Sequence, residues 1–188
     1  MKWLLALALS SILHPTIQVP DIDGVSRTPL KIEASGRATA LFFVTHDCPV
    51  SNYYSHEIRR ICEDYDKRGV SCSLVYVDPT LTDAQVRKHA EEYGHGVYPK
   101  IVDRTHQLVK ATGADVTPTV VLVRPDASIA YRGRIDNFYA ELGKPRRQVT
   151  AHDLRDALDA VVTGKPVSNP ETKPVGCYIP DLKFYGKG

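Results

Sequence analysis

The feature that most constrains the fold is a continuous apolar run that ends at a cysteine and a proline. Residues 40–44 read Ala-Leu-Phe-Phe-Val, and Cys48 and Pro49 follow three residues later. A short apolar run without alternation is typical of a strand buried on both faces of a sheet. Proline is favoured at the first helical position, because the amide hydrogen that it lacks would have no partner there. The pattern predicts a buried strand that turns directly into a helix, with Cys48 at the junction.

The residues after Pro49 continue as a helix, because apolar side chains recur three or four positions apart along one face. These side chains are Tyr54, Ile58, Ile61, Cys62 and Tyr65. Other patterns predict a hairpin over 19–32, a strand over 72–77, a helix over 82–94, paired strands over 120–123 and 129–134, and a helix over 150–164 capped by Thr150. Strands and helices in this order predict a three-layer α/β/α fold with a mixed central sheet.

Residues 1–18 are typical of a signal peptide. Lys2 supplies a positive start, and residues 3–13 form an almost unbroken apolar run. About eleven residues are too few to cross a bilayer, which needs roughly twenty, but they match the core of an export signal. The alternative is an N-terminal helix or strand packed on the domain. With a signal at 1–18, we expect the domain over 19–164 and a periplasmic or secreted protein, in a compartment where cysteines can pair.

The charge pattern and the hydropathy of the chain argue against nucleic acid and a membrane as partners. The formal net charge is +2, with Lys and Arg scattered among Asp and Glu. We therefore expect no nucleic-acid face. No segment beyond the leader is apolar and long enough for stable membrane insertion, and no organic cofactor is implied.

The position of Cys48 favours a reactive thiol. A sulfur at the start of a helix faces unpaired amide hydrogens and the positive end of the helix dipole, and both stabilise a thiolate. The thiolate is the form that attacks a disulfide or a peroxide. His46 could add positive charge or relay a proton, while Asp47 would oppose ionisation. Pro49 shapes the loop, and Ser51 could donate a hydrogen bond to the sulfur.

In these features the chain resembles the thioredoxin-like superfamily. The resemblance lies in the strand that runs into Cys48, and in Thr117-Pro118 followed by a strand and a hairpin. It spans residues 21–164. It implies that the bond before Pro118 is cis, that Pro118 lies against Cys48, and that the backbone of Thr117 is free to pair with an extended substrate strand.

Three segments resemble exported bacterial redoxin-domain proteins of the alkyl hydroperoxide reductase and thiol-specific antioxidant type. They are residues 21–24 (Asp-Ile-Asp-Gly), 48–52 (Cys-Pro-Val-Ser-Asn) and 131–136 (Tyr-Arg-Gly-Arg-Ile-Asp). The resemblance implies a thiol–disulfide redox protein that uses Cys48. Its partners would be protein thiols and disulfides or a hydroperoxide, together with a thiol reductant.

One departure from the superfamily matters for this function. Disulfide oxidoreductases carry Cys-x-x-Cys, whereas Ser51 stands at the second cysteine position here. Residues 165–188 have no helical period and are expected to pack on the domain as an extended tail. This tail is long enough to bring Cys177 to Cys48 as a candidate resolving thiol. Alternatively, Cys177 is a surface thiol or forms an intermolecular link.

Two other functions stay open at this stage. Thr45 matches part of the peroxidase motif Pro-x-x-x-Thr-x-x-Cys, but Leu41 holds the place of its proline. A thiol-dependent peroxidase is therefore one alternative. His46 and Cys48 form His-x-Cys, which could supply two ligands to Cu(I). A copper-binding or non-catalytic module is the other alternative, although we predict no metal site.

Cys62 and Cys72 are separated by a helix end, a turn and a strand start. A disulfide needs Cα atoms within about 7 Å, and a helix layer and a sheet layer are expected to lie roughly 10 Å apart, by analogy with packed sheets. We therefore favour two buried free thiols, which behave as small apolar side chains, over a Cys62–Cys72 disulfide.

Overall fold

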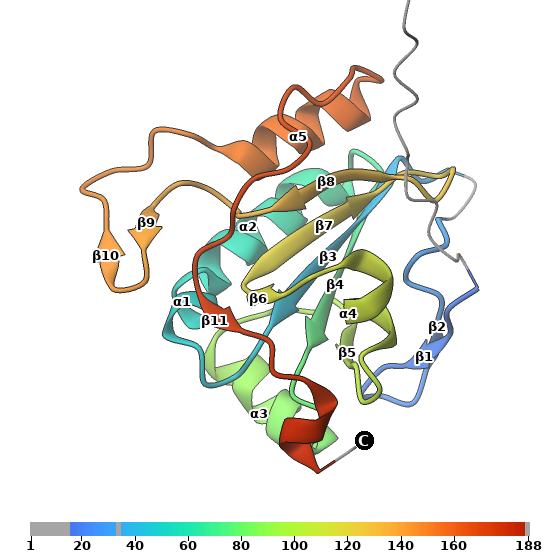
Figure 1. The fold of residues 1–188 in the computed structure, drawn as a ribbon. Helices are drawn as coiled ribbons and strands as arrows, with labels where there is room; N and C mark the ends of the chain where they lie inside the picture. Colours follow the sequence, from blue (N-terminus) through green and yellow to red (C-terminus); the bar gives the residue numbers. More distant parts are fainter. Residues whose placement is uncertain (1–15, 33–34, 187–188) are drawn as a thin grey trace, which may run out of the picture.

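The computed structural model describes residues 16–32 and 35–186. A five-stranded sheet with the order β5-β4-β3-β7-β8 forms the centre of the fold (Figure 1). Its strands are β3 (Ala38–Val44), β4 (Val70–Tyr76), β5 (Lys100–Val102), β7 (Thr119–Val123) and β8 (Ile129–Gly133). β4 is parallel to β3 and β5, whereas β7 is antiparallel to β3 and β8. The predicted mixed sheet is confirmed.

The central strand β3 accounts for most of the core. All of its residues are buried, as the unbroken apolar run predicts. Successive side chains of a strand point to opposite faces, so Phe42 and Phe43 belong to two different hydrophobic clusters on the two sides of the sheet. Each face therefore has its own apolar layer to be covered by helices.

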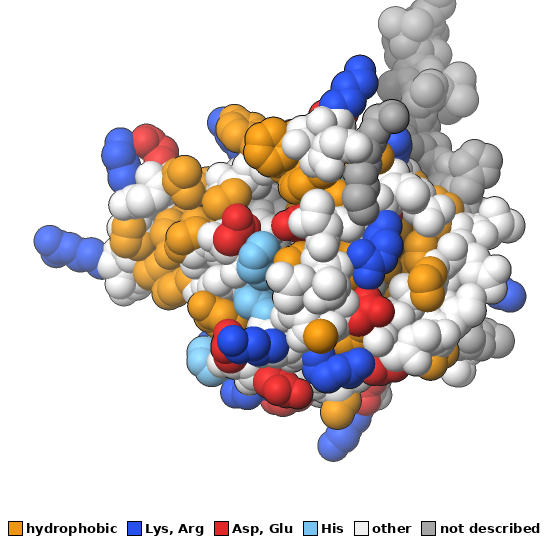
Figure 2. All heavy atoms as spheres, turned by 90° about the horizontal axis from the view of Figure 1, so that it is seen from below, with side chains coloured by type: hydrophobic (Ala, Val, Ile, Leu, Met, Phe, Trp, Pro, Cys, Tyr) orange, Lys and Arg blue, Asp and Glu red, His pale blue; other side chains and the backbone are white. Residues whose placement is uncertain are grey.

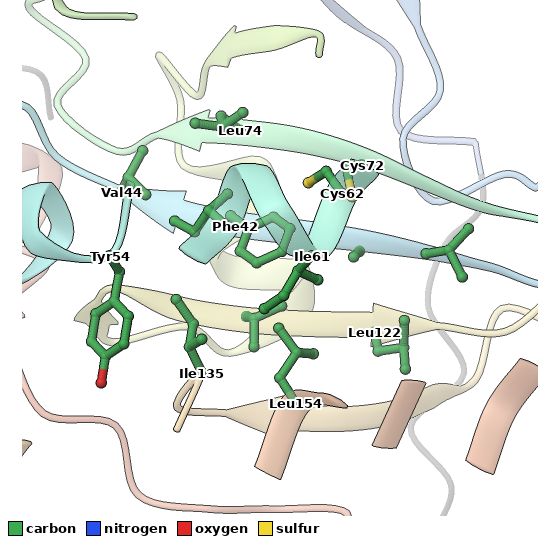
Figure 3. Packing of buried hydrophobic residues seen from close by; sticks show 14 of the residues in the cluster. Phe42, Val44, Tyr54, Ile61, Cys62, Cys72, Leu74, Leu122, Ile135 and Leu154 are labelled. Atoms are coloured by element: carbon green, nitrogen blue, oxygen red, sulfur yellow. The ribbon is translucent and has the colours of Figure 1, made fainter. Parts of the chain in front are cut away.

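Within the described residues, five α-helices lie around the sheet. They are α1 (Pro49–Tyr53), α2 (Ser55–Asp66), α3 (Asp83–Glu92), α4 (Gln107–Thr112) and α5 (Asp153–Val162). Apolar residues of α2 and α5, including Ile61 and Leu154, pack on the face that carries Phe42 (Figure 3). Leu108 of α4 packs on the opposite face with Phe43. This gives the predicted three layers.

Short elements complete the chain at the sheet edges and along the surface. They are β1 (Val19–Pro20), β2 (Ser26–Arg27), β6 (Val116–Thr117), β9 (Tyr139–Glu141), β10 (Lys144–Pro145), β11 (Cys177–Tyr178) and the 3₁₀ helix η1 (Leu182–Tyr185). β1 and β2 form the predicted antiparallel hairpin at the start of the domain.

One local expectation was wrong. Thr150 does not cap α5: the helix begins after His152, and Thr150 instead hydrogen bonds with Asn137. The expectation for Cys62 and Cys72 is confirmed, since both are buried free thiols. Their side chains lie close together between α2 and β4 (Figure 3), and burial, with a further effect of the neighbouring Cys72 thiol, raises the pKa of Cys62.

The segment after α5 lies along the domain rather than away from it. Residues 170–172 run beside β8, where the Arg132 amide donates to the Pro170 carbonyl and the Thr172 amide donates to the Arg132 carbonyl. The chain then crosses to β6, on which β11 pairs, and ends at η1 (Figure 1).

The predicted export signal lies mostly in residues 1–15, outside the residues that the structure describes. Within the described ranges, none of the helices has the length and apolar character to span a bilayer.

Candidate functional site

Cys48 is the last residue before α1, as the sequence predicts. Its backbone is extended (φ −84°, ψ 113°), and Pro49 is the first helical residue. The Cys48 carbonyl accepts the amide of Asn52 at 3.0 Å, the first hydrogen bond of the helix. The side chain is almost completely buried, with 1% of the residue exposed. The start of α1 therefore faces the Cys48 sulfur, whereas solvent has almost no access to it.

Pro118 follows a cis peptide bond, as the resemblance implied. The Cys48 thiol donates a hydrogen bond to the carbonyl oxygen of Thr117 at 3.4 Å. Sequence-distant Cys48 and the Thr-Pro pair therefore lie side by side at one end of the sheet.

The expectation that Thr117 would be free to pair with a substrate was wrong. β11 from the C-terminal tail pairs antiparallel with β6, with Cys177 opposite Thr117 and Tyr178 opposite Val116. The Thr117 hydroxyl also donates to the Cys177 carbonyl at 3.4 Å. The protein's own tail fills this position, because its extended backbone supplies the partners that the edge of β6 needs.

This pairing brings the thiols of Cys177 and Cys48 together. Burial works against ionisation of Cys48, but groups able to donate hydrogen bonds to the ionised sulfur outweigh it and lower the pKa of this thiol. They are the Cys177 thiol, the amide and hydroxyl of Ser51 and the amide of Val50. Burial and the neighbouring Cys48 sulfur raise the pKa of Cys177 to about 12. Of the two thiols, Cys48 is therefore the one that ionises more readily.

Ser51 occupies the position of the missing second cysteine. It is buried, and its hydroxyl has no hydrogen-bond partner among the described residues while Cys48 is a thiol. A buried hydroxyl without a partner is costly, and ionised Cys48 would provide the acceptor. The hydrogen bond from Ser51 to the Cys48 sulfur therefore stays a prediction for the ionised form.

His46 is tied to the site through its backbone. Its carbonyl accepts the side-chain amide of Asn52 at 2.9 Å, and its ring lies edge-on to that of His89, with 6.5 Å between ring centres. Thr45, the residue shared with the peroxidase motif, donates its hydroxyl to Asp47 at 2.9 Å. Asp47 in turn contributes to the raised pKa of Cys177.

A hydrogen-bonded chain behind the Cys48 loop was not found from the sequence. Asn52 accepts from Nε2 of the buried His89 at 2.9 Å, and Nδ1 of His89 lies 3.0 Å from the Tyr76 hydroxyl. Burial is the main cause that lowers the pKa of His89, with His46 adding to it. The neutral ring, with its proton on Nε2, fits both partners. Only the fold brings α1, α3 and β4 together, so no local pattern reveals this chain.

Aromatic side chains flank the site on another side. The Tyr54 hydroxyl donates to Asp136, and the half-exposed Tyr53 stacks on Phe138 with ring centres 4.6 Å apart. Figure 2 shows hydrophobic side chains gathered where α1 and the β9–β10 hairpin lie, with histidine side chains beside them. The pKa of Tyr139 in this group is raised, mainly by burial and additionally by the negative charge of a nearby Cys48 thiolate.

A metal site was not predicted, although His46 and Cys48 form a possible ligand pair. Within the described part of the chain, no group of three or more His, Cys, Asp or Glu side chains is arranged to hold a metal ion.

The fold and the Cys48 site together define a protein of the thioredoxin-like class. The model of the AhpC/TSA family matches residues 14–132, well over half of the chain, so the chain belongs to this family. A search of curated proteins finds no match.

Similar solved structures support this class. An uncharacterised conserved protein from Geobacillus kaustophilus is 29% identical, with 90% of each chain covered and a TM-score of 0.76. A hypothetical protein from Sinorhizobium meliloti 1021 is 25% identical, with 90% of this chain and 93% of that chain covered and a TM-score of 0.75. A secreted disulfide oxidoreductase of Mycobacterium tuberculosis shares the fold at 13% identity, over 77% of this chain and 95% of that chain, with a TM-score of 0.55.

Proposed function

We propose that this protein is a thiol–disulfide oxidoreductase whose redox pair is Cys48 and Cys177. The single observation that carries the proposal is the pairing of β11 with β6, which sets Cys177 opposite Thr117. The carbonyl oxygen of Thr117 also accepts the hydrogen bond from the Cys48 thiol. A resolving cysteine normally comes from Cys-x-x-Cys. Here the tail supplies it, and Ser51 fills the vacant position as a hydrogen-bond donor.

The reaction transfers two electrons between the pair and external sulfur compounds. In the oxidising direction, one external disulfide is reduced to two thiols while Cys48 and Cys177 lose two protons and two electrons and form a disulfide. In the reducing direction, two external thiols become a disulfide and the pair returns to thiols. The hydrogen bonds at the start of α1 favour Cys48 as the thiolate in either direction.

We further propose that the reaction takes place outside the cytoplasm. The apolar run at 3–13 supports export, and an oxidising compartment would allow the Cys48–Cys177 disulfide to persist. Expression in a bacterial host, followed by fractionation and N-terminal sequencing, tests this point. Recovery of the uncleaved chain in the cytoplasm alone would contradict it.

The redox pair is tested by mapping disulfides in the full chain after equilibration with glutathione buffers of graded potential. We expect one disulfide, between the peptides that carry Cys48 and Cys177, with Cys62 and Cys72 still alkylated as free thiols. Exchange with a cysteine-containing peptide disulfide should be lost in Cys48→Ser and strongly reduced in Cys177→Ser. Phe184→Ala, an exposed change in the same tail, is the matched control. Free Cys48 and Cys177 under oxidising buffers would refute the pair.

Peroxide reduction is the second candidate, because the chain belongs to the AhpC/TSA family. The Cys48 thiolate would attack the hydroperoxide, releasing an alcohol and forming a sulfenic acid, and the Cys177 thiol would then displace water to give the disulfide. The hydrogen bond from Thr45 to Asp47 makes this candidate weaker, since the motif hydroxyl already has another partner. Stoichiometric consumption of hydroperoxide with formation of the Cys48–Cys177 disulfide would favour it.

A further inference from the structure

The two thiols of the pair differ in their access to solvent. Cys48 is 1% exposed, and β11 covers it. Cys177 lies on that covering strand and is only partly buried. Figure 1 shows β11 beside α1 and β6, outside the end of the sheet at which Cys48 lies. The tail cysteine is therefore the outer sulfur of the pair, and the cysteine of the helix start is the inner one.

The tail is held on both sides of Cys177. On one side, the main chain of residues 170–172 hydrogen bonds with Arg132, and on the other the amide of Ile179 donates to the Asp115 carbonyl at 2.9 Å. Gly176 packs so closely on Thr117 that a Cβ would come 1.9 Å from its carbonyl oxygen. This backbone contact requires glycine. Cys48 is therefore covered by a strand that hydrogen bonds and close packing hold in place.

Thiol–disulfide exchange requires the attacking sulfur to approach the disulfide in line with the bond that breaks, and its rate depends on access to the attacked sulfur. Cys177 is partly exposed on the tail, so an external thiolate can reach this sulfur of a Cys48–Cys177 disulfide from solvent. Cys48 belongs to the buried core cluster, so an external thiolate has no comparable path to its sulfur. We propose that external thiols enter this protein at Cys177, so that the tail cysteine carries the mixed disulfide with the partner and Cys48 is the internal leaving thiolate.

This inference rests on the proposed redox pair and reverses the order of roles that the sequence suggested, in which Cys48 meets the substrate first. An external thiolate RS⁻ attacks Cys177, the bond between Cys48 and Cys177 breaks, and Cys48 leaves as the thiolate. A second RS⁻ attacks the sulfur of R in the mixed disulfide, RSSR is released, and Cys177 takes up a proton. Overall, two thiols are oxidised to one disulfide and the protein disulfide is reduced.

The surroundings of Cys48 suit a leaving group. Exchange is faster when the departing thiol forms a stable thiolate. The amides of Val50 and Ser51 and the unpartnered Ser51 hydroxyl are in place to receive this charge, and they lower the pKa of Cys48. For Cys177, burial, the Cys48 sulfur and the carboxylate of Asp47 all raise the pKa, so its thiolate is less stable than that of Cys48. Departure of Cys48 is therefore favoured over departure of Cys177.

The test begins with the full-length protein, oxidised and shown by mapping to hold the Cys48–Cys177 disulfide. The protein is mixed with glutathione in one arm and a cysteine-containing peptide in the other, quenched in acid at successive times, and treated with N-ethylmaleimide before peptide mapping. We expect the adduct on Cys177 and maleimide on Cys48, with a preference of about tenfold or more. The two arms show whether a small thiol or a polypeptide thiol is the faster partner.

A second measurement covers the case in which the mixed disulfide is resolved too quickly to be mapped. The remaining site cysteine in Cys48→Ser and in Cys177→Ser is loaded with 5-thio-2-nitrobenzoate, and glutathione is added. The leaving group is identical in the two variants, so the rate of its release compares access to the two protein sulfurs. We expect release from Cys177 to be about tenfold faster or more.

An adduct on Cys48, or release from Cys48 that is equal or faster, would overturn the entry at Cys177 and leave the redox pair standing. Failure of the first step, with no disulfide between the two cysteines, would instead refute the proposed function itself. The two failures are therefore distinguishable.

Discussion

Gly176 and Thr117 are in backbone contact, so close that any side chain on Gly176 would collide with the Thr117 carbonyl oxygen. The same carbonyl oxygen accepts a hydrogen bond from the Cys48 thiol. One oxygen atom thus joins the tail, the cis Thr-Pro segment and the start of α1. The position of Cys177 relative to Cys48 depends on this contact.

Gly176→Ala should separate the two cysteines. Forcing a methyl group into a packed contact costs about 1–3 kcal/mol. If the tail is displaced, this corresponds to an equilibrium for forming the Cys48–Cys177 disulfide that is weaker by about 5- to 150-fold. The fraction of disulfide in glutathione buffers measures this. The disulfide fraction of Phe184→Ala should match that of the wild type. An unchanged equilibrium in Gly176→Ala would contradict the close packing of the tail on Thr117.

Cys177→Ala should raise the pKa of Cys48. The thiol of Cys177 is the largest of the contacts that hold this pKa below its ordinary value, and alanine cannot donate a hydrogen bond. The pH dependence of Cys48 alkylation, followed by peptide mapping, should therefore shift to higher pH. Cys177→Ser, which keeps a donor, should shift less. Coincident profiles for the wild type and the alanine variant would contradict the direct contact.

Asn52→Ala should loosen the Cys48 loop and leave Nε2 of His89 without its acceptor. A buried polar group that loses its partner costs about 1–3 kcal/mol, so we expect a decrease of that size in the free energy of unfolding, measured with urea. Asn169→Ala, at an exposed position in the tail, provides the control. Equal stability of the two variants would show that the Asn52–His89 hydrogen bond contributes nothing.

Acid should destabilise the fold through His95. This side chain is 2% exposed, and burial, with smaller effects of His89 and Lys100, lowers its pKa from 6.5 to about 4. Above pH 6.5 the ring is neutral in both states. As the pH falls toward 4, the unfolded chain takes up a proton that the folded chain does not, so stability falls by about 2–3 kcal/mol.

Urea unfolding at pH 7.5, 6, 5 and 4 measures this loss. His95→Gln cannot titrate, so its stability should depend less on pH over the same range, whatever its stability at pH 7.5. His89, whose pKa is also lowered, should leave a residual slope. Parallel curves for the wild type and His95→Gln would exclude His95 as the cause.

Much of the fold follows from local patterns. The apolar run of β3, the proline that starts α1 and the apolar stripe of α2 predict the strand–Cys48–helix junction, because each rests on residues close together in the chain. The capping box of Thr82 and Gln85, with both of its hydrogen bonds, is present at the start of α3. At Thr150 a local signal failed, because a tertiary partner, Asn137, took the hydroxyl.

The sequence by itself determined that Cys48 would lie at the start of a helix after a buried strand, because periodicity and the backbone limits of proline act over a few residues. The tertiary structure alone decided that Cys177 faces Cys48, that β11 fills the edge of β6, and that His89 supports Asn52. The tail has no period to read, and its place depends on unpaired backbone groups of β6 that exist only once the sheet has formed. Such contacts depend on the assembled fold, in which residues far apart in the chain satisfy each other's hydrogen bonds.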